Sequence, residues 1–154
     1  MMKNLKIFLV LMVAVCYFSA PSFAQLQKPV KWSYAAKRLN ATEGILYIRG
    51  TIEKGWHIYS TVQPEGGPLK SSFSFTSGKS FSMIGGLVEP KPIKHFEKVF
   101  DMDVLYFENT VTFSQKIKLK DKKPFVVKGK LEYMACNDTQ CLPPDKVVFS
   151  IPVK

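Results

Sequence analysis

Apolar residues in this chain recur at every second position far more often than at a helical spacing. The clearest example is residues 111–119, where valine, phenylalanine, isoleucine and leucine alternate with threonine, serine and lysine. Gln115 is the one polar residue on the apolar side of this run. Such alternation predicts a strand with one face buried and the other in water.

Further strands are predicted where β-branched and aromatic residues cluster, at 45–52, 56–60, 71–75, 104–107, 125–133 and 146–151. Residues 31–40 fit either a helix or a strand. A tight hairpin turn is expected at 53–55, and glycine and proline break the chain at 64–68 and 85–86. Many strands without helical crossovers predict an all-β fold, an immunoglobulin-like antiparallel β-sandwich.

Residues 1–24 have the layout of a secretory signal peptide. Lysines precede an apolar run at 7–18, and small residues lead up to Ala24. The apolar run is too short to span a bilayer, and no second one follows, so we expect no membrane span in the mature chain. Cys16 is expected to be removed with the signal, which leaves one domain at residues 25–154.

The chain is basic, with a formal net charge of +10 that falls to +8 without the two lysines of the predicted signal. Many lysines alternate along predicted strands, namely Lys116, Lys118, Lys120, Lys122, Lys123, Lys128 and Lys130. This pattern is typical of a solvated sheet face protected by lysines. Attraction to an acidic partner or an anionic envelope surface is the alternative. Export argues against nucleic acid as a partner.

Two cysteines remain in the predicted mature chain, Cys136 and Cys141, separated by four polar, turn-forming residues. The strands predicted on either side suggest a hairpin with a cysteine on each arm. If 137–140 form a four-residue loop, the cysteines are cross-strand neighbours whose Cβ atoms lie slightly farther apart than a disulfide prefers, so that a small adjustment closes the bond. So small a loop gains little entropic stabilisation from a disulfide. Spacing alone leaves both a structural disulfide and a working dithiol open.

Other cysteine chemistry has less support. The cysteines lack a second Cys or His pair at ligand spacing, so no metal site is expected. The only histidines, His57 and His95, are far apart in sequence, and nothing places either beside a sulfur for nucleophilic catalysis. Thiol–disulfide exchange itself requires no cofactor, and none is expected.

Three segments resemble the N-terminal periplasmic domain of the thiol:disulfide interchange protein DsbD. They are GWHIYS at 55–60, FEKVFD at 96–101 and YMACNDTQCLPP at 133–144. The resemblance implies an immunoglobulin-like periplasmic domain that passes reducing equivalents between thioredoxin-fold partners through a reversible Cys136–Cys141 disulfide. It implies that Cys141 forms the mixed disulfide with a partner and that Cys136 resolves it.

The resemblance also implies residues around the cysteines. A cap loop is expected at 95–103, with Phe100 as its tip and Phe96 as the second candidate; ordinary core packing is the alternative for both. His57 and Tyr59 share one face of the strand that the resemblance places near the cysteines. They are expected to shape the site, the alternative being a cross-strand pair on a solvated face.

Two features depart from the family. Four residues separate the cysteines instead of five, and the chain stops at Lys154 without the membrane and C-terminal thioredoxin-like domains. The electron donor is therefore expected on another chain, and the acceptor is a disulfide isomerase or a cytochrome c maturation thioredoxin. Two other functions remain open: an exported binding or assembly module with a structural disulfide, and an adhesin-like sandwich that binds ligand through exposed aromatics such as Trp32 and Trp56.

Overall fold

The computed structural model describes residues 27–98 and 100–154, so the predicted signal peptide at 1–24 lies outside the described residues. The described part holds strands and no helix, and therefore no helix able to cross a membrane. Its strands are β1 Val30–Arg38, β2 Glu43–Ile52, β3 His57–Tyr59, β4 Ser72–Phe75, β5 Phe81–Val88, β6 Ile93–Glu97, β7 Met102–Glu108, β8 Thr110–Leu119, β9 Phe125–Tyr133, β10 Ala135–Cys136 and β11 Asp145–Val153.

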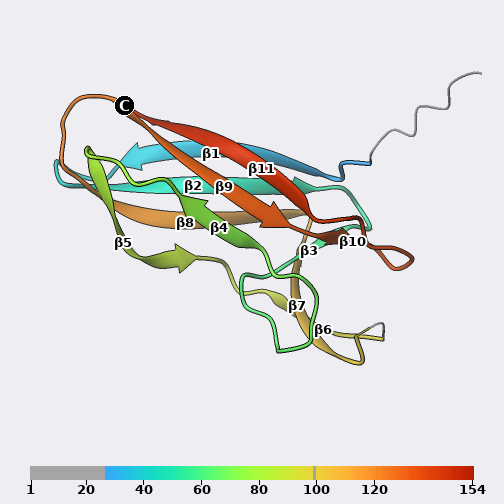
Figure 1. Ribbon diagram of the computed structural model, residues 1–154. Coiled ribbons are helices and arrows are strands. Elements are labelled where there is room, and N and C mark those ends of the chain that lie inside the picture. Colours follow the sequence, from blue (N-terminus) through green and yellow to red (C-terminus); the bar gives the residue numbers. More distant parts are fainter. Residues whose placement is uncertain (1–26, 99) are drawn as a thin grey trace, which may run out of the picture.

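The strands form three antiparallel sheets (Figure 1). Sheet A has the order β1-β2-β8-β5, and sheet C has the order β11-β9-β4. Inward side chains of these two sheets share one core cluster, with Leu46 and Phe113 from sheet A and Leu131 and Ile151 from sheet C. Sheet B, with the order β10-β3-β7-β6, lies at one end. The all-β immunoglobulin-like sandwich predicted from the sequence is confirmed.

Strand β8 shows how the alternating pattern positions the core. Its apolar residues are buried between the sheets, while Lys116 and Lys118 are exposed. Gln115, the polar exception, is also buried, and its Nε2 donates to the carbonyl of Ile84 at 3.0 Å. The register between β5 and β8 shifts directly after Ile84. A side-chain amide therefore satisfies a carbonyl next to an irregular point in the sheet.

Two turn predictions need correction. The turn at 53–55 exists, with the N–H of Trp56 donating to the carbonyl of Glu53 at 3.0 Å, but it joins β2 in sheet A to β3 in sheet B. No hairpin forms there, because both edges of β2 are already paired with β1 and β8. Gly85 and Gly86 do not break the chain either; they lie inside β5, at its register shift.

The undecided segment 31–40 forms strand β1 over most of its length. Trp32 of this strand lies opposite Gly50 of β2, where a Cβ atom would come within 3.0 Å of the indole. The indole also packs against Tyr133, with ring centroids 5.2 Å apart. Trp56 is buried in the core. The expectation of exposed tryptophans for ligand binding is therefore wrong, because both side chains are used in packing.

Gly129 in the middle of β9 provides a test of the core. A Cβ there would lie 2.6 Å from the carbonyl oxygen of Ser74 and would also strike the ring of Phe149. We expect Gly129→Ala to lower the free energy of unfolding by roughly 2 to 3 kcal/mol through overpacking, measured by urea denaturation. The matched control is Gly86→Ala, whose Cβ meets nothing within 4 Å. Equal stability of the two variants would contradict the packing described here.

Candidate functional site

The two cysteines lie in the connection between β9 and β11, residues 134–144. The chain leaves sheet C after β9 and forms β10, which pairs with β3 so that Cys136 lies opposite His57. It then turns, and Cys141 pairs with Cys136 through an isolated antiparallel bridge and a disulfide. The predicted cross-strand pair is confirmed. The prediction that the arms of the β9–β11 hairpin carry the cysteines is wrong, because β10 belongs to sheet B.

The loop between the sulfurs is closed by hydrogen bonds. The N–H of Asn137 donates to the carbonyl of Gln140, and that of Leu142 to the carbonyl of Ala135, both at 2.9 Å. The Oδ1 atom of Asn137 accepts from the N–H and the hydroxyl of Thr139, at 2.9 Å each, and from the N–H of Gln140 at 2.8 Å. A single side chain therefore fixes the turn that holds the cysteines opposite each other.

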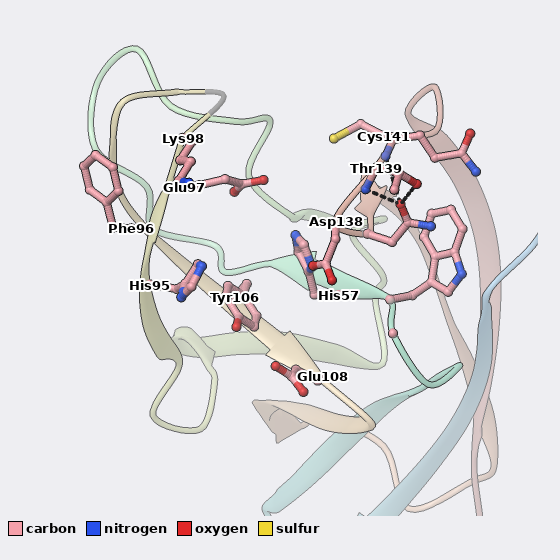
Figure 2. Close-up of a pocket in the computed structure, with 14 residues that line it drawn as sticks. His57, His95, Phe96, Glu97, Lys98, Tyr106, Glu108, Asp138, Thr139 and Cys141 are labelled. Carbon is pink, nitrogen blue, oxygen red and sulfur yellow. Dashed lines mark hydrogen bonds between the residues drawn. The ribbon is translucent and has the colours of Figure 1, made fainter.

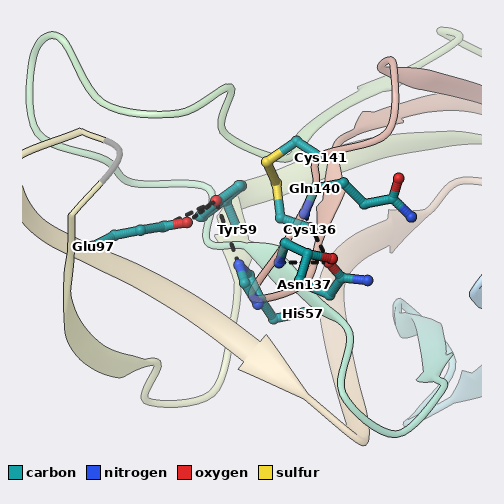
Figure 3. The surroundings of a disulfide bond; sticks show 8 residues. His57, Tyr59, Glu97, Cys136, Asn137, Gln140 and Cys141 are labelled. Carbon is teal, nitrogen blue, oxygen red and sulfur yellow. Dashed lines mark hydrogen bonds between the residues drawn. A yellow bond between two sulfur atoms is a disulfide. The ribbon is translucent and has the colours of Figure 1, made fainter.

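The two cysteines differ in their exposure to solvent. Cys136 is completely buried, whereas Cys141 is exposed on the return arm of the loop. Cys136 belongs to a small apolar cluster with the buried residues Tyr59 and Val104. One cysteine of the disulfide is therefore accessible to a partner, and the other is held inside the domain. Figure 3 shows the bond that joins them.

The hairpin of β6 and β7 covers this cluster. Phe100, in the turn between the two strands, packs against the cluster together with Met102, and its ring lies edge-on to Tyr59 with centroids 6.4 Å apart. Phe96 is half exposed on β6, at 51%, and Figure 2 shows its ring pointing away from Cys141. The geometry therefore places Phe100, and not Phe96, on the side of the buried sulfur. Their roles as caps stay predictions.

An open groove of about 910 Å³ runs between this hairpin and the cysteine loop (Figure 2). Cys141 lies on one of its walls, and residues of β6 form the opposite wall. The lining also includes His57, His95, Tyr106 and the carboxylates Glu97, Glu108 and Asp138. The accessible sulfur therefore faces a surface large enough for protein side chains and rich in acidic groups.

A hydrogen-bonded chain connects the hairpin to the strand beneath it (Figure 3). The hydroxyl of Tyr59 donates to the Glu97 carboxylate, at 3.2 and 3.1 Å from its two oxygens, and lies 3.4 Å from Nε2 of His57. Burial and the nearby Glu97 carboxylate raise the pKa of Tyr59 well above its ordinary value, so the phenol stays a donor at neutral pH. This bond ties β6 to β3.

His57 lies on the floor of the groove, beside both Tyr59 and Tyr106. Burial lowers its pKa below the ordinary value, and the carboxylates of Glu97, Glu108 and Asp138 offset that effect only in part. The imidazole is therefore neutral at pH 7. It can accept or donate a hydrogen bond but adds no positive charge beside the disulfide.

The structure thus gathers Cys136, Cys141, His57, Tyr59 and Phe100 at one end of sheet B, whereas Phe96 lies half exposed on the opposite wall of the groove. Sequence reasoning gave no role to Glu97 or to the turn-forming Asn137. No local pattern marked Glu97, because the residue that it binds, Tyr59, lies 38 positions earlier in the chain. The order Asn-X-Thr between two cysteines was the signal for the turn.

The described part is an immunoglobulin-like sandwich with an accessible disulfide in a groove at one end. The family described as "Thiol:disulfide interchange protein DsbD, N-terminal" matches residues 24–152, and the chain belongs to this family. DsbD N-terminal domains occur in the periplasm. No match to a curated protein sequence is found.

Solved structures show the same fold. The reduced DsbD N-terminal domain of Neisseria meningitidis is 14% identical, with a TM-score of 0.54 over 86% of this chain and 93% of that one. The complex between the DsbD and PilB N-terminal domains of the same organism gives 14% identity and a TM-score of 0.55, over 85% and 88%. The N-terminal periplasmic domain of ScsB from Proteus mirabilis gives 14% and 0.53, over 83% of this chain and 49% of that chain.

The Asn137 turn yields a prediction with a matched control. The β1–β2 loop contains the same arrangement, in which Oδ1 of Asn40 accepts from the N–H and hydroxyl of Thr42 and from the N–H of Glu43. Asn137→Ala and Asn40→Ala should each lower the free energy of unfolding by about 1 kcal/mol.

Only Asn137→Ala should also make the disulfide easier to reduce, because the dithiol is no longer held with its sulfurs opposed. We expect the reduction potential of the Cys136–Cys141 pair in this variant to rise by roughly 20 mV, measured by equilibration with dithiothreitol or glutathione. An equal shift in Asn40→Ala, or none in Asn137→Ala, would show that the turn does not organise the dithiol.

The position of Phe100 yields a second prediction. Replacing Phe100 by Ala removes apolar packing from the cluster around Cys136. We expect this to weaken the packing of the β6–β7 hairpin over Cys136 by ~1 to 2 kcal/mol. In the reduced protein, alkylation of Cys136 by iodoacetamide should then accelerate roughly 5- to 30-fold, while Cys141 changes little. Phe96→Ala on the same hairpin is the control and should leave both rates unchanged. Mass spectrometry of the alkylated peptides measures each site; a faster rate in both variants would rule out a specific cap.

Proposed function

We propose that this chain is a periplasmic thiol–disulfide exchange domain that passes reducing equivalents between thioredoxin-fold partners through a reversible Cys136–Cys141 disulfide. The observation that carries the proposal is the unequal exposure of the two sulfurs. Cys141 is exposed in the groove, while Cys136 is completely buried beneath the β6–β7 hairpin. Exchange requires one reachable sulfur and a neighbour placed to resolve the mixed disulfide.

Reduction begins when a thiolate of a reduced partner attacks Sγ of Cys141. The Cys136–Cys141 bond breaks, Cys136 leaves as a thiolate, and a mixed disulfide joins Cys141 to the partner. The partner's second thiolate then attacks its own sulfur in the mixed disulfide and releases Cys141. Two electrons have passed to the domain, both of its cysteines take up protons, and the partner has become a disulfide.

Delivery reverses these steps on a second partner. The Cys141 thiolate attacks the disulfide of that partner and releases one of its thiolates. Cys136 then attacks Sγ of Cys141, which re-forms the internal disulfide and frees the reduced partner. The Asn137 turn supports this step, because it keeps the resolving sulfur opposite Cys141.

The alternative of a structural disulfide has weaker support. The bond encloses only four residues, and backbone hydrogen bonds and the Asn137 side chain already close the same turn. It does not join the two large sheets, whose shared core is formed by other residues. Because entropic stabilisation by a disulfide grows with the length of the loop it closes, this one adds little to stability.

The partner class rests on the family and on the groove. A DsbD N-terminal domain forms a complex with the PilB N-terminal domain in Neisseria meningitidis. The groove beside Cys141 offers Tyr106, His95 and Phe96 as contact surface for a protein partner. We assign the electron donor to a thioredoxin-like domain, and the acceptor to a disulfide isomerase or a cytochrome c maturation thioredoxin. Residues 1–24 would serve as the signal peptide for export of residues 25–154.

Single-cysteine variants test the assignment of the two sulfurs. Cys136→Ala should form a stable mixed disulfide with a thioredoxin-fold partner, because Cys141 can react but nothing resolves the product. Cys141→Ala should trap no partner, since the remaining sulfur is buried. Trapping from the periplasm of an expressing cell, followed by non-reducing electrophoresis and mass spectrometry, measures both. Equal trapping by the two variants would refute the assignment, and none by either would refute the exchange function.

A further inference from the structure

The end of the molecule opposite the disulfide is built from four segments, 37–43, 76–80, 118–124 and residue 154, which we call the basic end. Hydrogen bonds join them: the N–H of Leu119 donates to the carbonyl of Thr42 at 2.8 Å, and that of Lys120 to Ser80 at 2.9 Å. The guanidinium of Arg38 donates to the carbonyl of Lys154 at 2.8 Å. In Figure 1 these segments lie together at the left, far from β10.

The basic end carries eight cationic side chains against the side-chain carboxylates of Glu43 and Asp121 and the α-carboxylate of Lys154. The cations are Lys37, Arg38, Lys79, Lys118, Lys120, Lys122, Lys123 and Lys154. All seven lysines are exposed, and in residues 27–98 and 100–154 the ion pairs that form, Lys94–Asp103 and Lys146–Glu132, involve none of them. Their charge is therefore available to an external anion.

Arg38 has a different role from the lysines around it. Its guanidinium also donates to the carbonyls of Asp121, Lys122 and Lys123, at 3.1 to 3.4 Å. These bonds hold the 118–124 segment against β1. The lysines on this segment are thus presented from an ordered backbone and not from a free tail, which lowers the entropic cost of binding several anions at once.

The opposite end is less basic. The groove beside Cys141 is lined by Glu97, Glu108 and Asp138 but by one lysine, Lys98, although Lys28, Lys31 and Lys54 are also exposed toward this end. Strand β8 begins at Thr110, two residues after Glu108 of the groove, and ends, ten residues long, at Leu119 of the basic end. Its length of about 33 Å separates the two ends. The positive charge is therefore unevenly distributed, and a negatively charged surface attracts the basic end more strongly than the other end.

Apolar side chains are exposed among and beside these cations. Leu39, directly after β1, is 45% exposed, and Val126, the second residue of β9, is 50% exposed. The combination of several lysines with exposed apolar residues suits the interface of a lipid bilayer, where the lysines meet the headgroups and the apolar side chains meet the acyl boundary.

We propose that the basic end binds the surface of a bilayer that contains anionic phospholipids, and that it does so with the disulfide facing away from the lipid. The cations come from four segments around a broad end, and the groove beside Cys141 lies at the other end. Charge spread over several segments fits a laterally mobile layer of anions better than a protein partner with fixed contacts. The disulfide then stays accessible to partners in solution.

The test is co-sedimentation of the oxidised mature protein, purified from the periplasm of an expression host, with large vesicles. We expect binding to vesicles of phosphatidylglycerol and phosphatidylcholine, none to phosphatidylcholine alone, and weaker binding as salt is added. The variant Lys120→Glu/Lys122→Glu/Lys123→Glu should bind on the order of 100-fold more weakly. Its control, Lys28→Glu/Lys31→Glu/Lys54→Glu, changes the charge equally at exposed positions toward the disulfide end and should retain binding.

Absence of binding to the anionic vesicles at low salt would overturn the proposal, as would equal losses in the two triple variants, which would indicate a response to net charge alone. Orientation is tested by reducing the vesicle-bound protein with soluble thioredoxin. The rate should equal that of the free protein, and strong protection of the disulfide would overturn the orientation. Binding is measured without any redox step, so its failure and that of the exchange function are separate results.

Discussion

The pairing of the two-residue strand β10 with β3 is the constraint on which the site depends. The chain leaves sheet C after β9 and forms β10 in sheet B. Cys136 is therefore buried beneath the β6–β7 hairpin, opposite His57. The tight turn that follows then returns Cys141 to the exposed side. Without this change of sheet, both sulfurs would lie on the β9–β11 hairpin with similar exposure, and neither partner access nor the choice of attacking sulfur would be defined.

Much of the fold could be predicted from the sequence, because its two large sheets follow simple alternation. Strand β8 is the clearest case, since each apolar position on its inner side is buried. The elements that were missed have other causes. Strand β5 contains Gly85 and Gly86 at a register shift, which hides its alternation. Strand β6 is an edge strand whose residues are mostly exposed, so it has no buried face to produce a pattern.

The site was less predictable than the fold. The proximity of Cys136 and Cys141 followed from their spacing, but their unequal burial did not, because it arises from the pairing of β10 with a strand almost 80 residues earlier in the chain. The bond between Tyr59 and Glu97 likewise joins residues 38 positions apart. Contacts of this kind depend on how the sheets pack, which local patterns in a single sequence do not determine. The Asn137 turn is local and could have been recognised.

The reduction potential of the Cys136–Cys141 pair tests the central claim most directly. Equilibrating the mature protein in dithiothreitol or glutathione buffers and counting free thiols measures it, with circular dichroism to follow the fold in both states. A carrier that works between thioredoxin-like donors and disulfide isomerases should have a potential of about −270 to −180 mV and stay folded when reduced. A potential below about −300 mV, or unfolding on reduction, would identify a structural disulfide and contradict the account.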